Sequence, residues 1–183
     1  VGDYINDKKD GFGIFISKDG TKYEGEYKNG KMEGKGKIYY KDNSIFEGHF
    51  KNGKKEGYGV HKYSNGKIFQ GEYKKDKRDG HGKIKYPNGE EYDGEYSKGV
   101  RQGKGVYTYK NGDKYEGDFV NNIREGQGKL FFADGRYYEG TFLNDKIEFE
   151  ENIITYNFKN KNTEPNRNIN IESNKLKKSY NNR

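Results

Sequence analysis

Residues 23–45 read YEGEYKNGKMEGKGKIYYKDNSI, and this pattern, repeated along the chain, decides the fold. The same skeleton restarts, without an insertion or deletion, at Phe46, Phe69, Tyr92 and Tyr115. A further start at Tyr138 loses the pattern after Phe142, and a truncated copy fills residues 1–22. A strict period of this length predicts stacked repeats rather than a compact enzyme fold. Function is then expected on a long surface and not in a pocket.

The composition sets limits on the core and on the compartment. Only 28% of the 183 residues are hydrophobic, but 16% are aromatic, and each aromatic ring buries a large area. We therefore expect a thin core, one layer deep and shared between neighbouring copies. The absence of cysteine favours a reducing compartment, and no apolar run approaches the ~20 residues of a membrane span. We expect a cytoplasmic protein, cytoskeletal or peripheral at a membrane, and a fragment of a longer chain, since Val1 begins partway through a copy.

We number the positions of a copy from its first aromatic residue. Positions 1 and 5 are aromatic and position 3 is glycine, as in Tyr23, Gly25 and Tyr27. A period of two places these residues on one face of a β-strand, where the glycine leaves room for a ring to lie on the backbone. The corresponding rings expected in the core of later copies are Phe46, Phe50, Phe69, Tyr73, Tyr92, Tyr96, Tyr115 and Phe119.

A second strand should follow in each copy. Positions 12 and 14 are glycine, as in Gly34 and Gly36, and position 18 is mostly aromatic, as in Tyr40. Asn-Gly or Asp-Gly at positions 20 and 21 predicts a two-residue type I′ hairpin turn. We expect positions 6 to 11 to form a looser loop. One copy is thus two short strands, and the chain is an antiparallel meander.

The pattern resembles the MORN repeat (membrane occupation and recognition nexus), whose motif runs Tyr-x-Gly-x-aromatic, then Asn-Gly, then Gly-x-Gly. Residues 23–40 and 92–112 match it nearly throughout, and the resemblance extends over about six to seven copies. It implies an all-β fold, an elongated and twisted single-layer antiparallel sheet of stacked β-hairpins. It implies less about activity, because such repeats occur in scaffolds, membrane-contact proteins, ciliary proteins and modules attached to enzymes.

The ends of the repeat array can also be placed. We expect the array to occupy residues 1–148, with partial first and last copies. Residues 152–158 alternate in polarity, so residues 149–158 are expected to supply a capping strand. Residues 159–183 are rich in Asn and Lys without an apolar period, which is typical of a disordered tail.

Charged residues occupy fixed positions of the strands. Acidic residues at positions 2 and 4 should face basic residues at positions 13 and 15, as Glu24 would face Lys37. Such cross-strand ion pairs contribute roughly 0.2–1 kcal/mol each. The pattern fits a solvated face whose pairs set the strand register, and it also fits a mixed-charge groove that receives a partner segment.

Basic residues recur at positions 9 and 10, between the two strands. Successive copies should lie about 10 Å apart, so these residues would form a ridge suited to anionic lipid or an acidic protein. Lysines at exposed tips also keep a sheet soluble and block edge pairing, which needs no ligand. The ridge comprises Lys9, Lys31, Lys54, Lys55, Lys77, Arg78, Arg101 and Arg124.

Further along the chain the same connections carry apolar residues. These are Val100, Val120, Ile123 and Leu143. Apolar residues in exposed loops predict a protein contact, and a second copy of this chain is one candidate partner.

The sequence offers no support for catalysis, and we expect no cofactor and no metal. His49, His61 and His81 hold three different repeat positions and show no metal-ligand spacing. The Gly-x-Gly pairs recur in every copy without the Gly-Lys-Ser/Thr of a phosphate loop. Nucleic acid is disfavoured despite a net charge of +7, because the acidic rows would repel phosphate and the rings are needed for packing.

We interpret the chain as a non-enzymatic scaffold of cytoskeletal or cortical type that presents a long sheet to another protein. The partner would be, for example, a helical segment lying in the sheet groove. Two alternatives remain open: a membrane-contact module that binds anionic phospholipid, and the targeting module of a larger enzyme. Lipid binding should depend on ionic strength and on the lysines, whereas protein contact should depend on the apolar loop residues.

Overall fold

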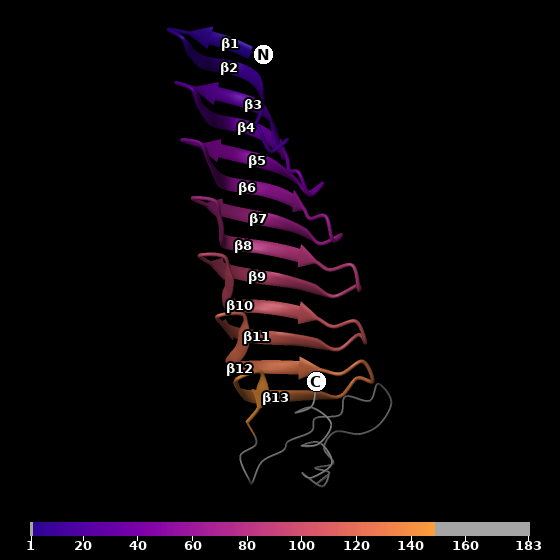
Figure 1. The fold of residues 1–183 in the computed structure, drawn as a ribbon. Coiled ribbons are helices and arrows are strands. Elements are labelled where there is room, and N and C mark those ends of the chain that lie inside the picture. Colours follow the sequence, from indigo (N-terminus) through magenta and orange to yellow (C-terminus); the bar gives the residue numbers. More distant parts are fainter. Residues whose placement is uncertain (1, 149–183) are drawn as a thin grey trace. The chain divides into compact units, whose positions relative to one another are not determined.

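A computed structural model describes residues 2–148, and every regular secondary-structure element in this range is a β-strand (Figure 1). Each strand pairs in antiparallel fashion with its neighbours in the chain, in the order β1 to β14, as an open sheet. The predicted all-β sheet of stacked hairpins is confirmed. Residues 2–148 contain no helix that is long and apolar enough to cross a membrane. The predicted cap at residues 149–158 and tail at residues 159–183 lie outside the described residues.

Two compact units divide the chain after Val100. The strands of the first unit are β1 (Gly2–Ile5), β2 (Lys8–Ile16), β3 (Lys22–Lys28), β4 (Lys31–Tyr39), β5 (Ile45–Lys51), β6 (Lys54–Lys62), β7 (Ile68–Lys74), β8 (Lys77–Lys85) and β9 (Glu91–Ser97). The remaining strands are β10 (Val100–Thr108), β11 (Lys114–Val120), β12 (Ile123–Phe131), β13 (Tyr137–Leu143) and β14 (Lys146–Ile147).

The tight turn of each repeat lies at positions 7 and 8. Lys28 pairs with Lys31, so Asn29 and Gly30 alone connect β3 to β4, with φ of 51° and 79°. Positive φ at both central residues is the signature of the type I′ hairpin. The expectation of a looser loop at positions 6 to 11 was therefore wrong, because positions 6 and 9 are already paired strand residues.

The connection at positions 19 to 21 is a three-residue loop. The backbone N–H of Tyr40 donates to the carbonyl of Ser44 at 2.9 Å, which leaves residues 41–43 outside the ladder. Of these three residues, Asn43 alone has positive φ, at 66°, and the Asp42 carboxylate accepts from the Ser44 N–H at 2.9 Å. This is a turn followed by a single left-handed residue. The predicted two-residue type I′ turn at positions 20 and 21 was wrong.

A β-bulge lies in the second strand of the hairpins β1–β2, β3–β4, β5–β6, β7–β8 and β11–β12. The register of β3 and β4 shifts between Gly25 and Tyr27, and Gly34 on the longer side has a φ of +67°. This conformation disfavours residues with a Cβ, which explains the glycine at position 12. After the bulge Met32 lies opposite Tyr27, so position 10 shares a face with the core rings.

The core consists of rings that interlock from repeat to repeat. The ring of Phe69 covers the backbone at Gly82, where an added Cβ would lie 2.5 Å from the ring. Phe69 also packs edge-to-face on Tyr73 of its own repeat at 5.4 Å and on Tyr96 of the next at 5.3 Å. The rings at positions 1 and 5 are buried in the same way: Tyr23, Tyr27, Phe46, Phe50, Phe69, Tyr73, Tyr92, Tyr96, Tyr115 and Phe119.

Candidate binding surfaces

The sheet has two chemically different faces. We call the face that carries positions 1, 5, 10, 16 and 18 the aromatic face, and the opposite one the outer face. On the outer face some of the expected cross-strand pairs form, with Lys37 contacting Glu47 at 3.3 Å and Lys129 contacting Glu139 at 2.7 Å. Glu24 lies opposite Lys37, as expected, but forms its ion pair with Lys22 of its own strand at 2.6 Å. These pairs are largely solvated, so their contribution to stability is small.

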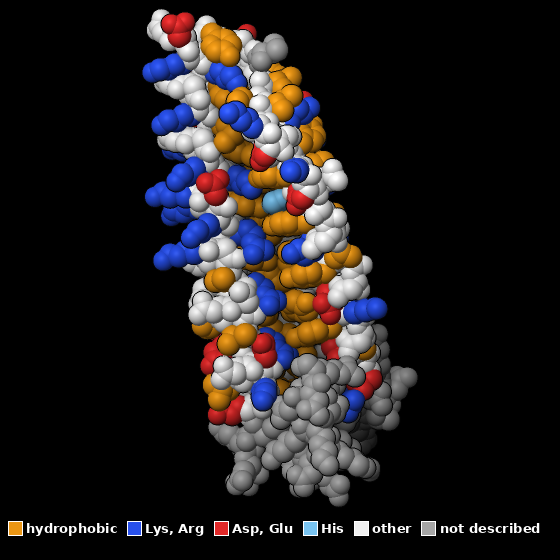
Figure 2. All heavy atoms as spheres, viewed as in Figure 1, with side chains coloured by type: hydrophobic (Ala, Val, Ile, Leu, Met, Phe, Trp, Pro, Cys, Tyr) orange, Lys and Arg blue, Asp and Glu red, His pale blue; other side chains and the backbone are white. Residues whose placement is uncertain are grey.

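The aromatic face of the first unit is incompletely covered. The rings at positions 1 and 5 are buried, but Tyr40, Tyr63 and Tyr86 at position 18 are only half-buried. Tyr40, which we expected among the structural core, thus lies at the rim of the packed rings. Figure 2 shows apolar side chains along the middle of this face, flanked by more polar hairpin ends.

The basic residues at position 10 lie on the aromatic face, over the rings. The guanidinium of Arg78 lies 4.8 Å from the Tyr96 ring centre and donates to the Gly99 carbonyl at 2.6 Å. Lys9 holds the same position over Phe15 and Tyr27, at 4.7 and 4.8 Å. The ridge predicted from positions 9 and 10 together is thus divided between the two faces, and position 10 contributes cation–π contacts.

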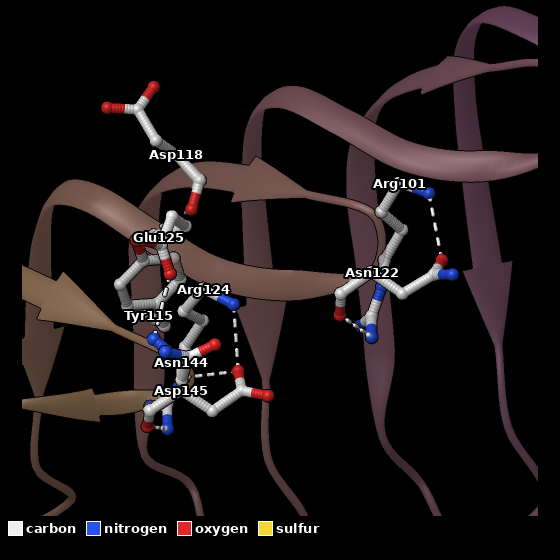
Figure 3. Close-up of polar contacts among 8 residues, drawn as sticks. All are labelled: Arg101, Tyr115, Asp118, Asn122, Arg124, Glu125, Asn144 and Asp145. Carbon is white, nitrogen blue, oxygen red and sulfur yellow. Dashed lines mark hydrogen bonds and ion pairs between the residues drawn. The ribbon is translucent and has the colours of Figure 1, made fainter.

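The second unit shows how an arginine at position 10 is anchored (Figure 3). Arg101 donates from its backbone N–H to Asn122 Oδ1 at 2.9 Å and from its guanidinium to the Asn122 carbonyl at 2.6 Å. Arg124 repeats this arrangement on Asp145, whose Oδ1 accepts from the Arg124 N–H at 2.8 Å and from its Nε at 3.3 Å. Each arginine therefore joins one hairpin to the turn of the next.

Lys55 differs from these arginines. Its Nζ lies 4.6 Å from the ring centre of Phe46 and 5.2 Å from that of Tyr40. Within the described part of the chain the Lys55 ammonium makes no hydrogen bond or ion pair. Burial lowers the pKa of this ammonium, with partial compensation by the charge of Asp76. The Lys55 ammonium is thus a partly desolvated cation without a hydrogen-bonding partner in residues 2–148.

His61 lies beside Lys55 and occupies a position that is isoleucine in two other copies, Ile38 and Ile84. Its ring stacks on Tyr63, with ring centres 3.9 Å apart at 22°, and on Tyr40 at 5.6 Å and 25°. Burial, reinforced by the charge of Lys55, lowers the pKa of His61 to about 4, so the ring is neutral at pH 7. Its Nε2 is buried without a hydrogen-bond partner in the part of the chain that the structure describes.

The other two histidines lie on the outer face, and His81 Nε2 contacts Asp93 Oδ1 at 2.7 Å. Among residues 2–148, no three His, Asp or Glu side chains are grouped so that they could hold a metal ion.

The lysines at position 9 lie at the hairpin tips, exposed on the outer face. In three successive hairpins of the first unit, the lysine at position 9 is directly opposite another exposed lysine at position 6. The pairs are Lys28–Lys31, Lys51–Lys54 and Lys74–Lys77. Like charges directly opposite are destabilising, and none of the six forms an ion pair within residues 2–148. Figure 2 shows Lys and Arg side chains projecting along one margin of the first unit.

The apolar residues expected at a protein contact occupy equivalent tip positions. Val120 and Ile123 are directly opposite each other, and Val120 is 37% exposed. Leu143 is 48% exposed and lies opposite Lys146. Val100 is half-buried at the end of the first unit.

One set of functional positions was missed by the reasoning from sequence. The residue at position 11 accepts a hydrogen bond from the turn of the following hairpin, as Glu33 does from the Asn52 N–H at 2.8 Å. Glu56 and Asp79 accept in the same way from Lys75 and Lys98, both at 3.0 Å. The recurrence of Asp, Glu or Gln at position 11 was the available signal.

These features define a β-repeat protein in which each hairpin caps and packs on the next. The MORN repeat family model matches residues 1–22, 23–45, 46–68, 69–91, 92–114 and 115–135. The chain therefore belongs to the MORN-repeat family. A comparison with curated proteins found no match.

Two solved structures illustrate the range of similar chains. The TCP10 domain of Danio rerio CPAP, in complex with a STIL peptide, is 13% identical with a TM-score of 0.48, and the match covers 71% of this chain and 59% of that one. The SAS-4 (dCPAP) TCP domain of Drosophila melanogaster, in complex with a proline-rich motif of Ana2, is 16% identical with a TM-score of 0.43, covering 71% and 77%. The match therefore spans less than two thirds of the CPAP domain from Danio rerio.

Proposed function

We propose that the chain is a non-catalytic interaction scaffold whose aromatic face binds a segment of a partner protein. The half-buried rings of Tyr40, Tyr63 and Tyr86 support this proposal most directly. They belong to a single-layer sheet, in which no second layer of the described residues covers them. A partner side chain that entered between these rings would remove apolar area from water, worth about 25 cal/mol per Å².

The cations on the same face favour a polypeptide partner over a purely apolar one. Lys55 and Arg78 lie within 6 Å of ring centres on the aromatic face, so charge and apolar surface alternate over short distances. A segment that mixes apolar and acidic side chains matches both features. Anchoring rings with nearby cations are the residue types that dominate binding energy at protein interfaces.

The test uses a library of displayed peptides selected on the full chain. Peptides that bind the aromatic face should lose affinity for Tyr63→Ala, which removes a ring from that face. They should keep their affinity for Tyr58→Ala, because Tyr58 lies in the same hairpin on the outer face and is 56% exposed. Selected peptides that ignore Tyr63→Ala and depend on Tyr58 would contradict the proposal.

A second candidate function, docking on anionic phospholipid, is supported by the lysine tips of the first unit. Three hairpins place two lysines each at the margin without ion pairs among the described residues. Each lysine close to an anionic bilayer contributes about 1 kcal/mol, and the attraction falls within a Debye length.

Vesicle flotation separates this candidate from the first. Phosphatidylcholine vesicles with phosphatidylserine should retain the wild-type chain at low salt and release it at high salt. Changing Lys31, Lys54 and Lys77 together to Glu should abolish retention. The matched control changes Lys18, Lys41 and Lys62 to Glu, which alters the net charge equally away from these tips. Equal loss in both triple variants would contradict docking through the tips.

A further inference from the structure

We propose that Lys55 is the receptor for a single carboxylate group of the partner segment, at the point where Tyr40, Phe46 and His61 surround it. This inference rests on the proposed function, because it assigns the chemistry of one contact on the aromatic face. The carboxylate would come from a glutamate or aspartate side chain whose methylene groups pack on the neighbouring rings.

The Lys55 ammonium group is partly desolvated. Lys55 Nζ lies 4.6, 5.2 and 5.7 Å from the ring centres of Phe46, Tyr40 and Tyr73, and these rings remove part of its hydration. Its backbone N–H donates to Asp76 Oδ1 at 2.9 Å, but its ammonium has no acceptor in the described part of the chain. A partly desolvated cation gains more from an arriving carboxylate than a fully hydrated one does.

Other repeats use the residue at this position differently. At the same position Arg78 donates to the Gly99 carbonyl and Arg101 to the Asn122 carbonyl, both at 2.6 Å. These guanidinium groups are already used to join hairpins. Met32, in the preceding repeat, has no charge at all. The fold therefore does not require an ammonium group at Lys55.

A neutral polar atom lies beside the lysine. Nε2 of His61 is buried without a hydrogen-bond partner within residues 2–148. Buried polar atoms are normally satisfied, so this atom beside the unpaired Lys55 ammonium marks a place that is electrostatically incomplete in the free chain. The neutral histidine adds no positive charge of its own, and a single carboxylate matches the single charge of Lys55.

The probe is N-acetylglutamate N-methylamide, titrated into the full chain and followed by NMR at the Lys55 Cε and the His61 ring. We expect saturable shifts at both residues and none with the glutamine analogue, which has the same shape without charge. N-acetylleucine carries only a terminal carboxylate. It therefore tests whether the bound carboxylate can come from a chain terminus instead of a side chain. Tighter binding of inorganic phosphate than of the glutamate probe would overturn the carboxylate assignment.

Three variants complete the test. Lys55→Met, which copies Met32, and Lys55→Gln should each weaken the glutamate probe at least tenfold at the His61 ring. Lys62→Met is the matched control, because Lys62 lies in the same strand but is exposed on the outer face, and it should leave the titration unchanged. Unchanged affinity in both Lys55 variants would overturn the inference.

The outcome is separable from that of the proposed function. Peptides that bind through Tyr63 but carry no required acidic residue would defeat the carboxylate site and leave the scaffold function intact. The opposite outcome would contradict the scaffold function alone. In that case the glutamate probe would bind at Lys55, but no selected peptide would lose affinity in Tyr63→Ala.

Discussion

The Glu33 carboxylate accepts a hydrogen bond at 2.8 Å from the backbone N–H of Asn52, the first residue of the next hairpin turn. The same turn donates from the Gly53 N–H to the Met32 carbonyl at 2.9 Å. These two bonds satisfy turn amides that a free hairpin would expose to water. Each repeat therefore holds the turn of its successor, which couples hairpins into one array.

Removing one of these carboxylates should destabilise the array. Glu56→Ala deletes the acceptor for the Lys75 N–H and should lower the free energy of unfolding by about 1 kcal/mol in a denaturant titration. Glu56→Gln is the control, because Gln102 occupies this position naturally and accepts from the Asn121 N–H at 3.2 Å. It should retain most of the stability, and equal losses in both variants would argue against the bond.

A methyl group at a ring-covered glycine should be costly. In Gly82→Ala the added Cβ would lie 2.5 Å from Phe69 Cζ, and Phe69 is fully buried and cannot move aside. We expect the free energy of unfolding to fall by about 1–3 kcal/mol. Gln70→Ala on the exposed side of β7 should change it by less than about 0.5 kcal/mol.

The stability of the first unit should depend on pH through His61. The pKa of His61 is about 4 in the folded chain against 6.5 ordinarily, so between these values the unfolded chain binds a proton that the folded chain does not. The stabilisation is therefore complete above about pH 6.5 and is lost as the pH falls toward about 4.

His61→Ile isolates this contribution, because Ile38 and Ile84 occupy the same repeat position. Chemical denaturation across this pH range should show a shallower loss of stability in the variant than in the wild type. Identical pH profiles would mean that His61 is not desolvated in the folded chain.

The apolar tips of the second unit should mediate self-association if they form the predicted contact. The test variant combines Val120→Lys, Ile123→Lys and Leu143→Lys. It places lysines at the tip positions that Lys51, Lys54 and Lys74 occupy in the first unit. Sedimentation should then show a monomer where the wild type shows a dimer. Val106→Lys is the control, because position 15 carries lysine in other copies, and it should leave the dimer intact.

The repeat fold was predictable because the rings and glycines recur at alternate positions of each strand. Such spacing places them all on the same face of a β-sheet. The prediction placed the two-residue turn at positions 20 and 21 and the longer loop at positions 6 to 11, whereas the structure has the tight turn at positions 7 and 8. The reason is that Asn-Gly suits both a two-residue turn and the last two residues of a three-residue loop. Their lengths depend on pairing, of Lys28 with Lys31 and of Tyr40 with Ser44, and the dipeptide alone does not encode that pairing. In the β11–β12 turn, Asn121 and Asn122 adopt positive φ without any glycine, so an Asn-Gly search would not have found this turn.

The candidate site was less predictable for the same reason. Positions 9 and 10 are both basic and adjacent in sequence, but the pairing of the tight turn sends Lys54 to the outer face and Lys55 onto the rings. In the sequence, His61 is notable only for its lack of a metal-ligand spacing, at a repeat position that is apolar or aromatic in the other copies. The role proposed for His61 depends on Lys55, which is six residues earlier in the sequence and lies beside His61 on the aromatic face.

The most direct test of the account is where a partner segment lies on the sheet. A selected peptide carrying a nitroxide spin label would be added to the full chain, and paramagnetic broadening measured at the tyrosine rings. We expect broadening of Tyr40, Tyr63 and Tyr86 on the aromatic face, with Tyr39 and Tyr58 on the outer face left sharp. Broadening of Tyr39 and Tyr58 with the aromatic face unaffected would contradict it.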